Sequence, residues 1–306
     1  MKPPTMNFYN FLKLLLIFVC FMNQQVLGQS LAQSLGNENF GKKSRFSYRL
    51  AQNLSNTLMN GGSLEELQPV NGLHLTPGLN RSAKAAIEPY NPGEPMINMK
   101  LVRWLKNSMP IAIWISPGLM LPSVPFDEIP NTRCDLVYQM IKTNPKNPFA
   151  TLSQAPNWTE STNEQVANGI EQWREFEKEG LFQFGFTDNP ADAQVLIFFT
   201  DIFKDASGPG GVAAGGITTA KIFPQDKLHL VHKMPVIIEL STVVNCEPEK
   251  MQASSAHEFG HALGIKAHSP YREDLMYVDR VVNNLSPADK ATIRYLYRTN
   301  TDYVMY

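Results

Sequence analysis

Four short segments of the chain have the apolar patterns expected of β-strands. They are residues 111–115, 182–186, 195–199 and 234–240. Three of them are nearly continuous apolar runs, which are typical of strands buried on both faces. In residues 182–186 phenylalanines alternate with other residues, and we interpret them as core packing. Pro117 and Gly118 indicate the end of the first strand.

Two further segments show the spacing of apolar residues that is typical of amphipathic helices. The first follows a long loop after the first strand, where Ser161 and Glu164 form a capping box and apolar residues recur through Trp173. The second lies near the C-terminus. There, Ser286 is placed to cap a helix with Pro287 at its first position, and apolar residues follow on one side.

A third helical segment carries candidate chemistry in the run His257-Glu258-Phe259-Gly260-His261. Residues four apart in a helix are offset by about 40° around its axis, so His257 and His261 face the same way. Two imidazoles one turn apart can share a tetrahedral Zn²⁺, which favours nitrogen ligands and keeps one position for water in catalytic sites. Glu258 lies beside the first ligand, where its carboxylate can act on that water as a general base. The spacing therefore predicts two ligands and a base.

Gly264 and His268 follow this helix and supply a candidate third ligand. Glycine can take the left-handed conformation that ends a helix, and residues 265–267 then lead His268 back toward the other two histidines. Asp274 or Glu273 is the alternative third ligand, because a carboxylate can complete a zinc site that already has two histidines. The sequence therefore predicts one zinc ion.

These motifs, together with Leu275-Met276-Tyr277, resemble the metzincin metallopeptidases and their matrixin-like branch. The usual pattern of that family has two residues between the glycine and the third histidine. This chain has three, and it resembles a variant found in bacterial matrixin-like proteases. The resemblance covers roughly residues 100–300. It implies a catalytic zinc ion held by the three histidines, with Glu258 as the catalytic base and Met276 as a support beneath them.

The resemblance also implies a fold and an activity. We expect an α+β metzincin-like catalytic domain, with a twisted, mostly parallel sheet, an active-site helix and a small C-terminal lower subdomain that ends in a helix. The glycine-rich residues 208–217 would form the edge strand of the active-site cleft, where an extended peptide can pair with the main chain. The implied function is a secreted zinc-dependent endopeptidase. The alternatives are a catalytically silent zinc-binding module that holds a peptide, and a zinc hydrolase of non-peptide amides.

The N-terminal part of the chain has the pattern of an export signal. Residues 11–22 are an apolar stretch, shorter than the about 20 residues of a transmembrane helix. Small residues then precede a possible cleavage point, so we interpret residues 1–28 as a signal peptide. Residues 29–99 are rich in polar residues, glycine and proline, and predict a low-order spacer or pro-segment with a short helix at 46–58. The catalytic domain would span residues 100–306, in a secreted or periplasmic protein.

Charge and cysteine content narrow the expected partners. The 27 basic and 28 acidic side chains leave a net charge of −1, which argues against nucleic acid and polyanionic membranes. We expect a protein or peptide substrate and no stable membrane partner. After the signal peptide, Cys134 and Cys246 remain and would form either one disulfide or two free thiols. His229 and His232 lack an acidic partner nearby, and we interpret them as strand histidines rather than a second metal site.

Overall fold

The computed structural model describes residues 87–204, 214–279 and 281–306. The predicted signal peptide, the predicted spacer up to residue 86 and its short helix at 46–58 lie outside the described residues. None of the described helices is both long enough and apolar enough to cross a membrane.

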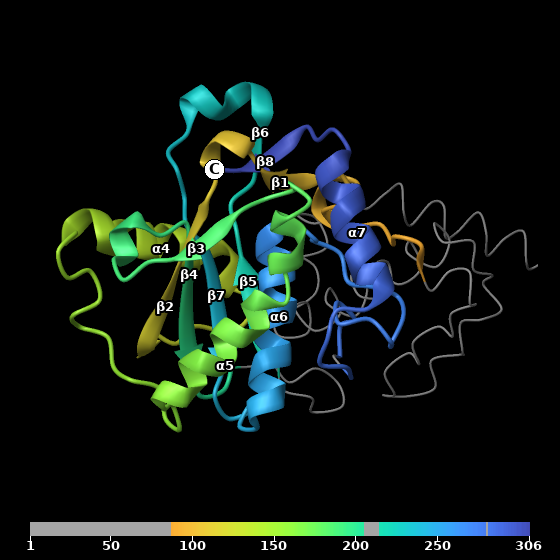
Figure 1. The fold of residues 1–306 in the computed structure, drawn as a ribbon. Coiled ribbons are helices and arrows are strands. Elements are labelled where there is room, and N and C mark those ends of the chain that lie inside the picture. The colour runs from red at the N-terminus through yellow and green to blue at the C-terminus, as the bar shows by residue number, and fades with distance from the viewer. Residues whose placement is uncertain (1–86, 205–213, 280) are drawn as a thin grey trace, which may run out of the picture. The chain divides into compact units, whose positions relative to one another are not determined.

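A five-stranded mixed sheet lies at the centre of the α+β fold (Figure 1), with the strand order β3-β2-β4-β7-β5. The strands are β2 (Ile111–Met120), β3 (Phe184–Phe186), β4 (Val195–Thr200), β5 (Gly216–Thr219) and β7 (Val236–Ser241). The first four in this order are parallel, and β5 runs antiparallel to β7 at the edge. All residues of β7, and all residues of β4 except Thr200 at its end, are buried, which explains the continuous apolar runs of these strands.

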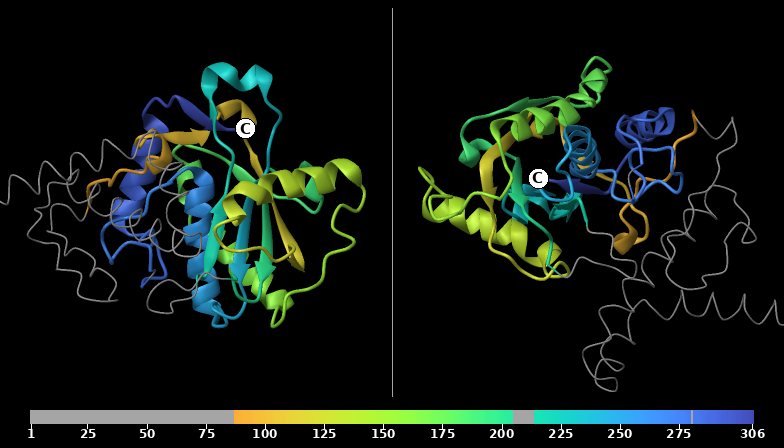
Figure 2. Two further views of the ribbon diagram at one scale, coloured as in Figure 1. Left: turned by 180° about the vertical axis from the view of Figure 1, so that it is seen from behind. Right: turned by 90° about the horizontal axis from the view of Figure 1, so that it is seen from below.

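Helices cover both faces of this sheet (Figure 2). On one face lie α5 (Glu160–Glu171) and α6 (Pro248–Leu263), and on the other lies α4 (Ile129–Thr143). Successive side chains of a strand point to opposite faces. Accordingly, Ile197 of β4 packs in the core with α5 and α6, whereas Phe198 packs in the core with α4.

Helix α4 lies within the segment that the sequence pattern predicted as a long loop. Its buried face includes Arg133, whose Nε donates to Oε1 of Glu239 in β7 at 2.7 Å and whose Nη1 donates to the Pro122 carbonyl at 2.8 Å. Both side chains of the ion pair are 3% exposed. Two buried charges are tolerated together because each compensates the other. A charged residue on the buried face interrupts the apolar periodicity by which the helix would have been recognised.

Strand β2 is longer than the sequence predicted. It continues through Pro117 and Gly118 to Met120, and its pairing with β4 shifts register along the way. Irregular pairing of this kind tolerates proline, which cannot donate a ladder hydrogen bond. Of the alternating aromatic residues, Phe184 is buried but Phe186 is 45% exposed, so the core interpretation is wrong for Phe186.

Helix α5 confirms the predicted helix but begins earlier. Its N-cap is Thr159, which forms a capping box with Thr162 in place of the predicted pair Ser161 and Glu164. Each of the two side chains accepts from the main-chain N–H of the other residue. Serine and threonine both cap helices well, so residue type alone does not distinguish these two registers.

A second sheet of three strands has the order β1-β8-β6. The strands are β1 (Val102–Trp104), β6 (Phe223–Pro224) and β8 (Tyr303–Met305). Helix α7 (Pro287–Arg298) begins as predicted, with Ser286 as its N-cap. The prediction that this part of the chain ends in a helix is wrong, because β8 follows α7 and pairs with β1 and β6. A three-residue strand is too short to show a periodic pattern.

Short 3₁₀-helices occupy several connections: η3 (Pro95–Ile97), η4 (Lys106–Ser108), η5 (Arg174–Glu177), η6 (Pro190–Asp192) and η7 (Gln225–Leu230). His229 lies in η7, and His232 follows it with its ring stacked on Tyr138, so the prediction of strand histidines is wrong. Cys134 is buried and Cys246 is exposed, and both are free thiols rather than a disulfide. Burial raises the pKa of the Cys134 thiol to about 11.

Candidate metal centre

Helix α6 positions the first two histidines of the candidate centre. His257 and His261 lie one turn apart, and their Nε2 atoms are 3.1 Å from each other. Each ring donates its other nitrogen, Nδ1, to a main-chain carbonyl: His257 to Leu275 at 2.7 Å and His261 to Ile265 at 2.5 Å. A carbonyl can only accept, so in the neutral rings Nε2 carries the lone pair that a metal requires.

The turn at Gly264 brings the third histidine to the other two. Gly264 has φ of +115° and ends α6, and a Cβ at this position would lie 2.2 Å from the Val102 carbonyl oxygen of β1. Only glycine combines this backbone conformation with so close an approach. Beyond the turn, the Nε2 atom of His268 lies 3.3 Å from that of His261.

The distances among the three histidines fit a tetrahedral metal. One ring nitrogen of each histidine lies within 4.8 Å of the others, and no other such group occurs among the described residues. Two nitrogens that each lie about 2.0–2.1 Å from a tetrahedral zinc ion are about 3.3 Å apart. Burial lowers the pKa of His261 to about 4, so this ring is neutral at pH 7. The three histidines could therefore hold a metal ion and are compatible with zinc.

The alternative third ligands lie elsewhere. Asp274 is fully buried, and its two oxygens accept the hydroxyls of Ser269 and Ser286, the latter at 2.6 Å. Glu273 is exposed. Neither carboxylate belongs to the cluster of metal-ligating side chains. Of the three candidates, it is His268 that the fold places beside the other two histidines, despite the extra residue in the loop.

The last carbonyl groups of α6 accept hydrogen bonds from side chains of β1, of α7 and of the loop that follows α6. The Ala262 carbonyl accepts from Trp104 Nε1 of β1 at 2.8 Å, and the Leu263 carbonyl accepts from the Tyr297 hydroxyl of α7 at 2.9 Å. The His261 carbonyl accepts from Lys266 Nζ at 3.2 Å. The last four carbonyls of a helix lack partners within it, so these contacts fix the end of α6 next to His261. The sequence patterns did not predict these contacts.

Met276 packs against helix α6, and Asp289 binds the backbone of Met276 and of its neighbour Leu275. The Met276 sulfur packs so close to α6 that a Cβ on Gly260 would lie 2.5 Å from it. The Asp289 carboxylate accepts from the N–H groups of Leu275 at 2.8 Å and of Met276 at 3.4 Å. Burial, with the nearby Asp274 carboxylate as a second cause, raises the pKa of Asp289. The carbonyl oxygen of Leu275 accepts a hydrogen bond from His257 Nδ1. Asp289 is therefore connected to the first histidine through the backbone of Leu275.

Glu258 lies between α6 and the edge strand β5. The residue is 5% exposed, and the Thr218 hydroxyl lies 2.8 Å from both its Oε2 and its main-chain oxygen. A Cβ on Gly216 would lie 2.8 Å from Oε1, so the strand passes directly over the carboxylate. Residues 208–213 of the predicted edge strand lie outside the described residues. The observed edge strand β5 shares only Gly216 and Ile217 with the predicted segment and continues to Thr219.

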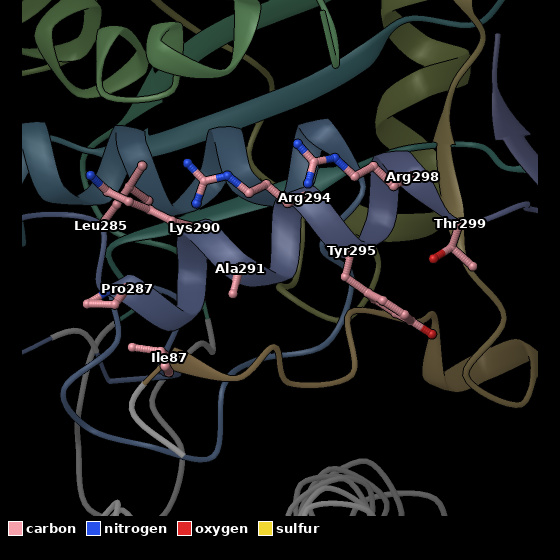
Figure 3. A pocket seen from close by; sticks show the side chains of 9 residues that line it. All are labelled: Ile87, Leu285, Pro287, Lys290, Ala291, Arg294, Tyr295, Arg298 and Thr299. Atoms are coloured by element: carbon pink, nitrogen blue, oxygen red, sulfur yellow. The ribbon is translucent and has the colours of Figure 1, made fainter. Parts of the chain in front are cut away.

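A groove of about 690 Å³ runs along α7 (Figure 3) and includes neither the three histidines nor Glu258. Its basic side chains are paired with acidic ones from η5 and the residues after it: Lys290 with Glu175 at 2.8 Å, and Arg294 and Arg298 with Glu179 at 2.7 and 2.9 Å. Ion pairs of this kind are ordinary features of a protein surface. The groove therefore contains none of the three metal-ligating histidines, and the candidate metal centre lies outside it.

Gly264→Ala is expected to destabilise the metal-free protein by about 2–4 kcal/mol, because the strained backbone and the overlap with β1 both contribute. Gly180→Ala is the matched control, since Gly180 also has a positive φ of +68° but no atom would lie within 4 Å of its Cβ. The control is expected to cost about 1–2 kcal/mol. Urea unfolding measures both values, and equal losses would contradict the contact between Gly264 and Val102 as a cause.

No protein-family model matches the chain, and a comparison with curated protein sequences finds no match. The structure itself defines an α+β protein with a mixed sheet and a cluster of three histidines that could hold a metal ion.

Proposed function

We propose that the protein is a zinc-dependent endopeptidase of the metzincin type. The observation that carries the proposal is the cluster of three histidines next to Glu258. The Nε2 atom of His261 lies 3.1 Å from that of His257 on the same helix and 3.3 Å from that of His268 in the loop after it. A metal site by itself does not require a carboxylate beside its first ligand. The presence of Glu258 in this position favours a hydrolase over a silent zinc-binding module.

In the proposed reaction a bound zinc ion would lower the pKa of its water and would polarise the scissile carbonyl. Glu258 accepts the proton of the attacking water on a carboxylate oxygen and passes it to the departing amine nitrogen. The Thr218 hydroxyl, 2.8 Å from Oε2, holds this carboxylate in place. The Nδ1–H donors of His257 and His261 orient the two rings through the carbonyls of Leu275 and Ile265.

The position of β5 supports an extended peptide as the substrate. This strand lies at the edge of the sheet, and its residues Gly216 and Thr218 contact Glu258. A peptide that pairs with the main chain of an edge strand would be held in an extended conformation next to the catalytic carboxylate. Secretion belongs to the same proposal and is supported by the apolar pattern of residues 11–22.

The purified protein is expected to bind one Zn²⁺ and to cleave peptides from a mixed library. A chelator should abolish cleavage, and added Zn²⁺ should restore it. Elemental analysis measures the metal, and mass spectrometry of the library measures the cleavage. Absence of bound zinc would contradict the metal site. Bound zinc without peptide cleavage would contradict the endopeptidase, and an assay with non-peptide amides would then distinguish a different hydrolase from a binding module.

A further inference from the structure

A short segment near the start of the described chain contacts the loop that leads to His268. We name residues 90–93 the strap. The Pro92 carbonyl oxygen in the strap accepts the N–H of Lys266 at 2.8 Å and that of Ala267 at 3.4 Å. A carbonyl oxygen has two lone pairs, so this single atom satisfies both main-chain donors of the loop.

The strap is anchored on both sides of Pro92. On one side Tyr90 is 2% exposed, and its N–H donates to Thr292 Oγ1 of α7 at 3.0 Å. Its hydroxyl also donates to Oδ1 of Asp289 in α7, at 2.7 Å. On the other side Gly93 packs on the backbone of Met99, where a Cβ on Gly93 would lie 2.0 Å from the Met99 carbonyl oxygen. The Pro92 carbonyl is therefore held between two fixed points.

Two of the three main-chain N–H groups at residues 265–267 find their acceptor outside the loop. Ile265 is satisfied from within, since its N–H donates to the Gly260 carbonyl at 3.0 Å and its carbonyl accepts from His261 Nδ1. The next two N–H groups point to Pro92 instead. Ala267 is fully buried and Lys266 is partly buried, and a buried donor without an acceptor is costly. Release of the strap would therefore favour another conformation of the loop.

We propose that the strap is a positioning element of the metal centre. Through the N–H groups of Lys266 and Ala267, Pro92 holds the loop in the conformation that places His268 beside the other two histidines. The inference rests on the metal site of the proposed function. It also gives a role to residues 90–93, which the sequence pattern assigned to the spacer.

The test uses the full chain and compares Gly93→Ala with Gly185→Ala. The first change cannot be accommodated without moving the strap, whereas no atom would lie within 4 Å of a Cβ on Gly185. We expect Gly93→Ala to lower the Zn²⁺ affinity, measured by chelator competition, by about tenfold, as changes behind metal ligands typically do. Gly185→Ala should bind as the wild type does. Thr292→Val, which removes only the acceptor of the Tyr90 N–H, is a milder variant expected to act in the same direction.

A double-mutant cycle separates positioning from general destabilisation. If the strap acts through His268, Gly93→Ala should have no further effect on Zn²⁺ affinity in a His268→Ala background. Amide hydrogen exchange of the metal-free protein should also show faster exchange at Lys266 and Ala267 in Gly93→Ala than in Gly185→Ala. Equal affinities of these two variants, or the same loss in both backgrounds, would overturn the proposal while the metal site stands. A wild-type protein that binds no Zn²⁺ would overturn the metal site together with it.

Discussion

His261→Ala is expected to lower the Zn²⁺ affinity by more than about a hundredfold. Loss of a partner behind a ligand already costs about 10–100-fold, and removal of the ligand itself costs more. The Nε2 atom of His261 is the one that lies within 3.3 Å of both other Nε2 atoms, so this ring is central to the cluster. The affinity is measured by chelator competition on the purified protein.

The matched control is His229→Ala, since His229 is exposed in η7 and lies outside the cluster. It should bind zinc with unchanged affinity. His268→Ala extends the comparison to the third ligand and should also lose most of the affinity. Full zinc content in His268→Ala would transfer the third-ligand role to Asp274 or Glu273, and full affinity in His261→Ala would contradict the site altogether.

Glu258→Gln is expected to lower peptide hydrolysis by at least about a hundredfold while zinc remains bound. The amide keeps the shape of the side chain and can still accept from the Thr218 hydroxyl, but it cannot take a proton from water. Turnover of one peptide substrate and zinc content are measured on the same preparation. The result would separate chemistry from metal binding.

Glu249→Gln serves as the control for Glu258→Gln. It makes the same substitution in the first turn of α6, where Glu249 is exposed, and it should leave hydrolysis unchanged. Hydrolysis by Glu258→Gln at a rate near that of the wild type would contradict the proposed base. Loss of zinc from Glu258→Gln would instead show that the carboxylate supports the metal site.

Local patterns in the sequence were sufficient for the elements whose signals repeat over several residues. The buried strands β4 and β7 are continuous apolar runs, and α7 begins at the predicted cap, Ser286. The patterns failed where a tertiary contact replaced the apolar signal. Helix α4 was missed because the buried Arg133 is compensated by Glu239, which lies 106 residues further along the chain. Strand β8 was missed because three residues carry no period.

The candidate site divides in the same way. The helical repeat of 3.6 residues already places His257 and His261 on one face, so the sequence by itself determined that pair. It left the third position open among His268, Asp274 and Glu273. Only the tertiary structure decided between them, because the path of the loop depends on main-chain groups distant in sequence: the Val102 carbonyl against Gly264 and the Pro92 carbonyl at the loop's two donors. A backbone carbonyl leaves no mark on residue type, so no sequence pattern could have shown either contact.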